Sequence, residues 1–479
     1  MNLRTWFPAL AGALPLLATT APAQQVTNPF LPGTPARLSY AREFPALHYE
    51  QAAADNRVAR LQQQLDSGKA KLDFTPGRGY LDSLLAALGI DTSSQTLVYS
   101  KTSLQKGVIS AATPRAIYFN TDTYVGYVQG GIGQARNGAV IEIATLDDRL
   151  GQVFYTLDNT APGPDNTTPS VAAQAAPQLA RQTTSCLSCH DTYEMSGGGV
   201  PRFLLMSSYV DIHGNQLTHE DQILTEDETP LKYRWGGWYV SGQSGRQVHV
   251  GNLQVHEVQE LVHLDQIRRG NLDNLDSLFD TAPYPTDKSD IVALLVLQHQ
   301  VTVQNLITRV NFETRQALAG QNKTQSKEQG QGGLAALPGK RRQQVYDWID
   351  QLADALSFAN AAAITDTISG NAGFDHWLTS QGPRDGQGRS LRTLDLHDRL
   401  FRYPVSYLIQ SPAFDALPDP ARERVYARVL ALLKGQLPAP AAPRPAVPAA
   451  DAAATLEILQ ATSPGFAHFL ATHGGKAGG

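Results

Sequence analysis

Two cysteines and a histidine form the motif in this sequence whose residue types and spacing indicate a defined chemistry. Cys186, Cys189 and His190 stand in the order Cys-x-x-Cys-His, and these are the chain's two cysteines. This spacing is typical of c-type haem attachment. Two thioethers then reach the vinyl groups on one porphyrin edge, and the next residue places an imidazole beneath the iron. The motif predicts one covalent haem c, with His190 as the proximal ligand.

Two other chemistries use a Cys-x-x-Cys pair. A zinc site needs further cysteine or histidine ligands at short spacing, and the sequence has no second pair. A thioredoxin-like disulfide is expected in a βαβ context, which the flanking residues do not indicate. The immediate histidine and the export signal described below both favour haem over these alternatives.

The ligand on the other side of the iron is left open by the sequence. Met206 lies in an apolar run, where methionine is more often a core residue. His249 follows a Gly/Ser-rich turn, and the surrounding aromatic and glycine residues predict a hairpin or a compact loop. His299 lies on an apolar helical stripe, so it is either a buried structural histidine or an iron ligand. The distal position is therefore predicted to hold Met206, His249 or His299, or to be open to small molecules.

Several other side chains are candidates for the surroundings of the haem. Trp235, Trp238 and Tyr239 are expected to line its edge, with ordinary core packing as the alternative. Guanidinium groups match the carboxylate geometry of the haem propionates. The candidates for that role are Arg181, Arg202, Arg234 and Arg246, and the alternative for each is a solvated surface position.

The N-terminus predicts the compartment. Residues 1–23 combine Arg4, a short apolar stretch and an Ala-Pro-Ala end, which is the pattern of a signal peptide cleaved after Ala23. We expect a periplasmic or secreted protein, with no later segment apolar enough to span a bilayer. The formal net charge of −5 gives no sign of nucleic-acid binding.

The remaining sequence predicts an α+β fold, in which a β-rich N-terminal part packs against a mainly helical C-terminal part with the haem between them. Residues 24–75 read as helical and 286–435 as a helical region, with helices expected at 286–320, 338–365, 394–411 and 418–435. Strand-like runs separated by Gly, Asn and Asp are expected at 96–100, 116–120, 124–128, 139–143 and 153–157. The predicted regions are a β-rich region over 24–165, a haem region over 166–285, a mobile loop at 322–333, a Pro/Ala linker over 436–453 and a short tail over 454–479.

Several strings together resemble a family of large, exported, single-haem bacterial proteins described only as cytochrome c domain-containing proteins. They are Ser94-Gln95-x-Leu97-Val98-Tyr99-Ser100-Lys101, Pro114-Arg115-Ala116-x-Tyr118-Phe119-Asn120, Tyr124-Val125-Gly126-Tyr127, the Cys-x-x-Cys-His motif, Arg234-Trp235-Gly236-Gly237-Trp238-Tyr239-Val240, His249-x-Gly251-Asn252, His299-Gln300 and Leu400-Phe401-Arg402-Tyr403-Pro404. The resemblance covers about residues 80–435. It implies haem binding and electron transfer, and it brings no known substrate. Dihaem peroxidases differ, because they carry two such haem motifs.

Three functions follow from these observations. The first is periplasmic electron transfer by one covalent haem, with a redox partner protein. The second is a monohaem redox enzyme with an open or displaceable distal site, acting on peroxide or another small molecule. Its support is the size of the chain, because a domain of roughly 100 residues is enough to hold such a haem. The third is a sensor or structural partner in which the haem stabilises the fold.

Overall fold

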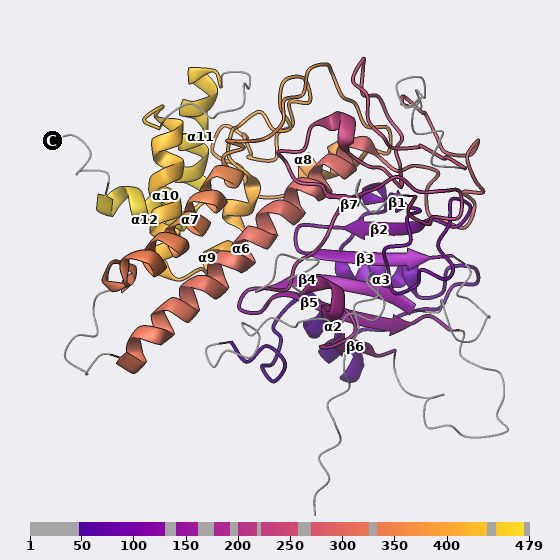
Figure 1. Ribbon diagram of the computed structural model, residues 1–479, viewed down its shortest axis with the longest axis horizontal. Coiled ribbons are helices and arrows are strands. Elements are labelled where there is room, and N and C mark those ends of the chain that lie inside the picture. Colours follow the sequence, from indigo (N-terminus) through magenta and orange to yellow (C-terminus); the bar gives the residue numbers. More distant parts are fainter. Residues whose placement is uncertain are drawn as a thin grey trace, which may run out of the picture.

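The computed structural model describes residues 47–129, 140–160, 177–191, 200–217, 222–256, 270–324, 333–437 and 447–473. The strands are β1 (Thr96–Val98), β2 (Arg115–Phe119), β3 (Thr123–Val128), β4 (Val140–Asp147), β5 (Gly151–Asp158), β6 (Leu179–Gln182), β7 (Met206–Ser207), β8 (Ile223–Leu224) and β9 (Trp238–Tyr239). The helices are α2 (Arg57–Asp66), α3 (Leu81–Leu88), α4 (Leu187–His190), α6 (Ile291–Thr324), α7 (Gly339–Leu356), α8 (Phe374–Ser380), α9 (Pro412–Asp415), α10 (Asp419–Leu433), α11 (Ala449–Thr462) and α12 (Pro464–His473). Figure 1 shows the strands on one side of the molecule and the long C-terminal helices on the other.

The N-terminal half is built on an antiparallel sheet. Within the described ranges it has seven strands in the order β6-β5-β4-β3-β2-β1-β9. Strands β2 to β5 follow one another as hairpins, and each of the five strand-like runs predicted from the sequence overlaps one of the strands β1 to β5. Every residue of β3 is buried, so both faces of the sheet are covered at its centre. Together with the C-terminal helices, the sheet confirms the predicted α+β class.

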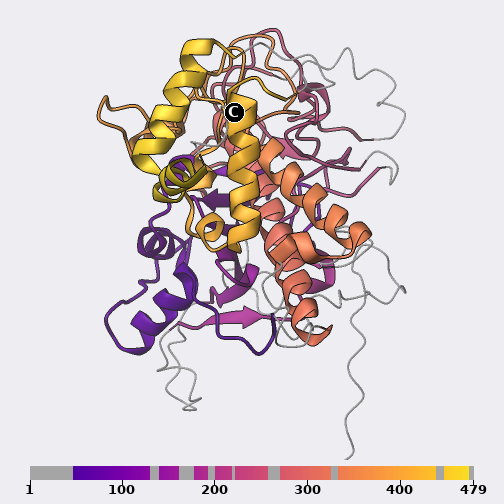
Figure 2. The same cartoon turned by 90° about the vertical axis from the view of Figure 1, so that its left-hand side faces the viewer.

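Helix α6 lies between the sheet and the helices α7, α10, α11 and α12, packing on β5 and on α7 (Figures 1 and 2). The predicted apolar stripe forms its core face, with Val292, Val296 and Val303 fully buried. Its segment Ile291–Ala319 is long and apolar enough to cross a membrane by length and composition, so the prediction that no such segment follows the signal peptide is wrong. Because 89% of its most apolar window is buried inside the fold, it has the setting of a core helix.

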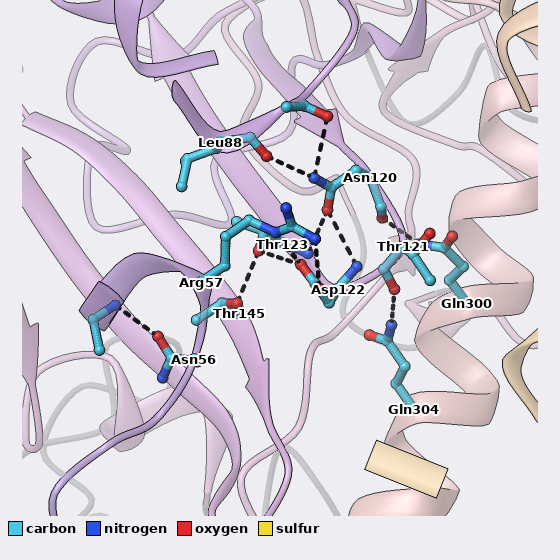
Figure 3. Close-up of polar contacts among 12 residues, drawn as sticks. Asn56, Arg57, Leu88, Asn120, Thr121, Asp122, Thr123, Thr145, Gln300 and Gln304 are labelled. Carbon is cyan, nitrogen blue, oxygen red and sulfur yellow. Dashed lines mark hydrogen bonds and ion pairs between the residues drawn. The ribbon is translucent and has the colours of Figure 1, made fainter. Parts of the chain in front are cut away.

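The turn between β2 and β3 joins the sheet to three helices (Figure 3). Gln300 and Gln304 of α6 donate hydrogen bonds to the carbonyls of Asn120 and Thr121, at 2.9 and 2.7 Å. Asn120 also donates from its side chain to a carbonyl at the end of α3, and Asp122 forms an ion pair with Arg57 of α2. These side-chain contacts fix α6 against the sheet, and α6 in turn positions the segment that holds the candidate site.

Several predicted boundaries differ from the structure. Within 24–75 the described part is helical only over Arg57–Asp66. The helix predicted at 394–411 is wrong: bends and turns replace it, apart from the short helical turn Tyr407–Gln410. Part of the predicted linker, from Ala449 onward, belongs to α11, and the predicted tail forms α11 and α12. The predicted signal peptide and most of the predicted loop at 322–333 lie outside the described residues.

Helices at 338–365 and 418–435 are confirmed as α7 and α10, with α7 ending earlier than predicted. Strand β9 pairs with β1, and the residues around His249 form no strand that would complete a hairpin with it. Instead Asn252 ties this segment back to Val240, accepting from its backbone N–H at 2.7 Å and donating to its carbonyl at 2.8 Å. Of the two predicted alternatives, the structure has the compact loop.

Candidate functional site

One turn of helix gathers the three motif side chains. Helix α4 covers Leu187–His190, and both Cys189 and His190 donate their backbone N–H groups to the carbonyl of Cys186. Residues three and four apart share one helix face. The spacing therefore places both thiols and the imidazole on the same side, while Leu187 and Ser188 are buried on the other side.

The three side chains face a single cavity of about 220 Å³. Its lining is mainly apolar and aromatic, and all of it comes from between Val98 and Trp238. The lining residues supplied by the sheet strands are Val98, Arg115, Ile117, Tyr124, Gly126, Glu142, Ile143, Ala144, Phe154, Tyr155 and Trp238. The cavity therefore lies against the sheet and the motif segment. It draws on the predicted β-rich and haem regions and on no residue of the C-terminal helices, so it does not lie between the two parts of the fold, where the haem was predicted.

The His190 ring is held in one orientation. Its Nδ1 lies 2.7 Å from the carbonyl oxygen of Arg202, which requires a proton on Nδ1 and leaves a lone pair on Nε2. Nε2 forms no hydrogen bond with the described part of the chain. Burial lowers the pKa of His190 to about 4, so the imidazole is neutral near pH 7. A metal-binding histidine shows the same pattern, with one nitrogen oriented by a carbonyl and the other free for the metal.

Helix α6 holds the Arg202 carbonyl in place through the neighbouring residue Phe203. The side chain of Asn305 accepts a hydrogen bond from the backbone N–H of Phe203 at 3.0 Å and donates one to its carbonyl at 2.9 Å. The adjacent Arg202 also donates its backbone N–H to the His190 carbonyl. The Phe203 ring lies 6.2 Å from the imidazole, and Phe154 of β5 lies 4.6 Å from it on centroid distances. His190 is thus positioned jointly by the sheet and by α6.

The two thiols are free and half-buried. Burial raises the pKa of Cys186 to about 12 and also raises the pKa of Cys189. Redox-active Cys-x-x-Cys pairs have a thiol whose pKa is lowered, so this environment disfavours the disulfide alternative. The described residues hold no group of three or more His, Cys, Asp or Glu side chains suited to a metal ion, which leaves the zinc alternative without further ligands in those ranges.

Met206 is the distal candidate that the structure brings to the cavity. It lies on β7, is 8% exposed and is among the residues that line the cavity. Its sulfur accepts a hydrogen bond from Gln222 Nε2 at 3.5 Å, and its carbonyl accepts one from the indole N–H of Trp238 at 2.7 Å. A methionine that lines the same cavity as His190 is a candidate iron ligand.

The structure places the other two distal candidates elsewhere, and neither lines the cavity. His299 is fully buried, and both its ring nitrogens are engaged: Nδ1 lies 2.6 Å from Asp227 Oδ2 and Nε2 lies 2.7 Å from Ser406 Oγ. His249 packs edge-on against Trp235 and accepts a hydrogen bond from the Gly251 N–H at 3.1 Å. Neither histidine therefore lies at the cavity that contains His190, and the contacts of both are those of structural residues.

Of the three aromatic residues predicted to line the haem edge, Trp238 lines the cavity and the other two do not. Adjacent residues of a strand point to opposite faces, and Tyr239 accordingly points away and donates its hydroxyl to the carbonyl of Ala111 at 2.6 Å. Trp235 is buried at 1% exposure and does not line the cavity. These two residues are core aromatics, the alternative that the sequence left open.

The four predicted propionate partners also lie outside the cavity. Arg181 donates to the carbonyls of Tyr49 and Ala52, and Arg234 is buried with donors on the carbonyls of Thr229 and Asp227. The Arg202 guanidinium lies 3.4 Å from Glu226, and Arg246 lies 3.1 Å from Asp366. Each of these arginines has a partner away from the haem motif.

The cavity instead contains charged residues that the sequence did not single out. Arg115 of β2 and Glu142 of β4 form an ion pair of 2.5 Å between Nη2 and Oε2, with side chains 17% and 12% exposed. The exposed Lys106 lies at the cavity as well. A single charged residue inside an apolar strand, such as Glu142 between Ile141 and Ile143, is the sequence signal that could have marked this site.

The donor set fits a c-type haem. Two cysteines, a histidine with a neutral and oriented imidazole, and a methionine line one largely apolar cavity. Comparisons of the chain with protein-family models, with curated proteins and with solved structures give no match.

Proposed function

We propose that this chain is a c-type haem protein that transfers electrons. The observation that carries the proposal is the convergence of Cys186, Cys189 and His190 on one cavity, with His190 Nδ1 held by a carbonyl. A helical turn explains how the motif presents all three groups on one side. A motif match in the sequence alone would not require that convergence.

Each residue has a definite role in this proposal. Cys186 and Cys189 would hold the haem through thioethers, and His190 would bind the iron through Nε2. Met206 would offer its sulfur across the cavity, with Gln222 and Trp238 fixing the residue in place. The haem supplies reversible one-electron chemistry. The protein contributes ligand identity, hydrogen bonding to the ligands and an apolar surrounding, which together set the reduction potential.

The compartment and the partner belong to the same proposal. The signal-peptide pattern ending at Ala23 directs the chain to the periplasm or outside the cell, where c-type haem is attached. The redox partner would be a protein that exchanges electrons at the exposed mouth of the cavity. Leu104, which is 49% exposed, and Lys106 lie at this mouth.

The test is covalent haem attachment. The full chain, produced with its signal peptide in a host that matures c-type haem, is expected to show a c-type pyridine haemochrome spectrum and haem that stays with the denatured polypeptide. Replacing Cys186 and Cys189 with Ala is expected to abolish both signals. Thr184→Ala, an exposed neighbour of the motif, is the matched control. A c-type spectrum that survives in the double variant would refute the assignment.

A second function, a monohaem enzyme acting on a small molecule, is favoured by one observation. Arg115 and Glu142 place a charged pair inside the cavity, where an electron carrier needs none. Carbon monoxide binding to the ferrous protein separates the two functions. If carbon monoxide leaves the spectrum of the parent protein unchanged but changes that of Met206→Ala, the result supports an electron carrier with methionine on the iron. Rapid binding to the unaltered protein supports the enzyme.

A further inference from the structure

We propose that Arg115 and Glu142 form a binding site in the haem cavity for a small protic molecule of the class of hydrogen peroxide or hydrogen cyanide, which binds iron as its anion. The inference rests on the haem site proposed above. Both side chains line the cavity that contains His190, Cys186 and Cys189.

The pair is built by strand register. Gly126 of β3 lies directly between Ile117 of β2 and Glu142 of β4, and Arg115 is two residues from Ile117 on the same face. A Cβ atom at Gly126 would lie 2.5 Å from Arg115 Nη2 and 2.8 Å from its Nε. Glycine in a strand interior marks such a close approach. The guanidinium reaches Glu142 because the residue between them has no side chain.

The pair keeps hydrogen-bonding capacity for a ligand. Glu142 accepts from Arg115 at Oε2 and from Ser103 Oγ at Oε1, at 2.5 and 2.8 Å. Each carboxylate oxygen accepts more than one hydrogen bond. The Nε of Arg115 is buried and has no hydrogen-bond partner in the described part of the chain. Buried donors are rarely left unpaired in folded proteins, and a ligand at this wall of the cavity would supply the missing acceptor.

The position of the pair disfavours a role as an anchor for the haem propionates. Burial is the main cause of the raised pKa of Cys186; the charge of Glu142 raises it further and that of Arg115 lowers it. Glu142 and Arg115 also line the cavity together with Cys186 and Cys189, whereas the propionates of a haem lie on the edge opposite its thioethers. A propionate would also meet the negative charge of Glu142 beside Arg115, and such like-charge proximity is unfavourable.

The chemistry is a proton transfer without change of oxidation state. The ligand HX gives its proton to the carboxylate of Glu142, which becomes a neutral carboxylic acid. The anion X⁻ accepts hydrogen bonds from the Arg115 guanidinium, which stays charged throughout. A positioned general base contributes about 10²- to 10⁴-fold to the rate of such a step. A charged hydrogen bond contributes roughly 10- to 100-fold to affinity.

Ligand binding to the haem-loaded protein tests the proposal without measuring turnover. Potassium cyanide is added to the ferric protein near neutral pH, where the ligand is mostly hydrogen cyanide, and binding is followed by the shift of the Soret band. Carbon monoxide with the ferrous protein is the control, because it has a similar size and carries no proton. The variants are Glu142→Gln, Arg115→Leu and Gly126→Ala, with Asp82→Asn, from an Arg–Asp ion pair on α3 outside the cavity, as the matched control.

All measurements are repeated in the Met206→Ala background, so that a thioether on the iron does not hide an effect. We expect Glu142→Gln to slow cyanide association about 100-fold, and Arg115→Leu to weaken cyanide binding about 10-fold. Gly126→Ala keeps both charges but displaces the guanidinium, and it should weaken cyanide binding in the same direction. Carbon monoxide association should change less than about 3-fold in every variant.

The outcomes separate this inference from the proposed function. If Glu142→Gln changes the rate of cyanide association less than about 3-fold in both backgrounds, the inference is overturned and the haem site is unaffected. Parallel losses of cyanide and carbon monoxide binding would also overturn it, since they indicate a collapsed cavity. A chain without covalent haem would overturn the proposed function and, with it, this inference.

Discussion

The replacement of His299 by alanine tests whether this histidine is structural, as its contacts indicate. His299 lies in the middle of α6 with no exposed surface. Its two ring nitrogens contact Asp227 at 2.6 Å and Ser406 at 2.7 Å, and Phe358 stacks on the ring at 4.4 Å. The substitution removes both polar contacts and leaves the Asp227 carboxylate, whose side chain is 13% exposed, without this partner.

The expected loss of stability is large. Removing the hydrogen-bond partner of a mostly buried carboxylate costs about 1.5–3 kcal/mol, because the carboxylate stays buried without compensation. The missing imidazole also leaves a void beside Phe358 and Phe401, although partial collapse limits that cost. We expect His299→Ala to lower the free energy of unfolding by about 4 kcal/mol, a large fraction of the roughly 5–15 kcal/mol typical of folded domains.

The assay is urea denaturation of the haem-loaded protein, followed by circular dichroism, together with the visible spectrum of the folded variant. Ser406→Ala is the matched comparison and should cost about 1–2 kcal/mol, since it removes one neutral hydrogen bond and the cap that Ser406 provides to the Leu408 N–H. The double variant should be less destabilised than the sum of the two, because they share a contact. The ferric spectrum should match that of the parent protein.

Two results would refute this reasoning. A destabilisation below about 1 kcal/mol would mean that the Asp227 and Ser406 contacts carry little free energy in water. A change of the ferric spectrum from low-spin to high-spin in the folded variant would return His299 to the iron, against the observed engagement of both ring nitrogens.

Three further predictions follow from contacts around the site and in the helical half. Asn305→Leu removes both side-chain hydrogen bonds to the backbone of Phe203, so the Arg202 carbonyl that orients His190 loses its support. We expect this substitution to shift the midpoint potential of the haem in a redox titration. An unchanged potential would contradict this. Burial lowers the pKa of His249 from 6.5 to about 4, so the unfolded chain binds a proton that the native state excludes, and native stability falls as the pH drops from about 6.5 to about 4. His249→Gln should reduce the fall in Tm between pH 7 and pH 5, and an equal fall in both proteins would speak against it. Arg424→Ala removes a bidentate ion pair with Asp350 of α7 at 2.7–2.8 Å. Because the site is half-exposed, the free energy of unfolding should fall by about 1 kcal/mol or less, measured by chemical denaturation at low and high salt. A loss of stability that does not depend on salt would indicate lost packing instead.

Local features of the candidate site were accessible from the sequence. The Cys-x-x-Cys-His spacing predicted that the two thiols and the imidazole serve one haem, and the structure places the three residues on one helical turn, where residues three and four apart share a face. Alternating apolar residues between turn signals predicted the strands β1 to β5, and a repeat of three and four predicted the buried face of α6. These patterns depend on neighbours a few residues away, so they can be read along the chain.

The surroundings of the motif required the tertiary structure. The partners of His299 are 72 and 107 residues away from it, so its isolated position on an apolar stripe left both a structural histidine and an iron ligand open. Met206 looked like a core residue, and only the position of β7 brings it to the cavity wall. The four candidate arginines were proposed because a guanidinium matches the geometry of a carboxylate, whereas strand register placed Arg115 beside Glu142 at the cavity wall.

The sequence by itself determined the chemical groups of the motif, their common orientation and the type of most secondary-structure elements, because each depends on local periodicity. The tertiary structure alone decided which distant side chains face His190 across the cavity and which are satisfied elsewhere. Those choices depend on strand pairing and on the packing of α6 against the sheet, where buried polar groups must find partners that sequence order does not reveal.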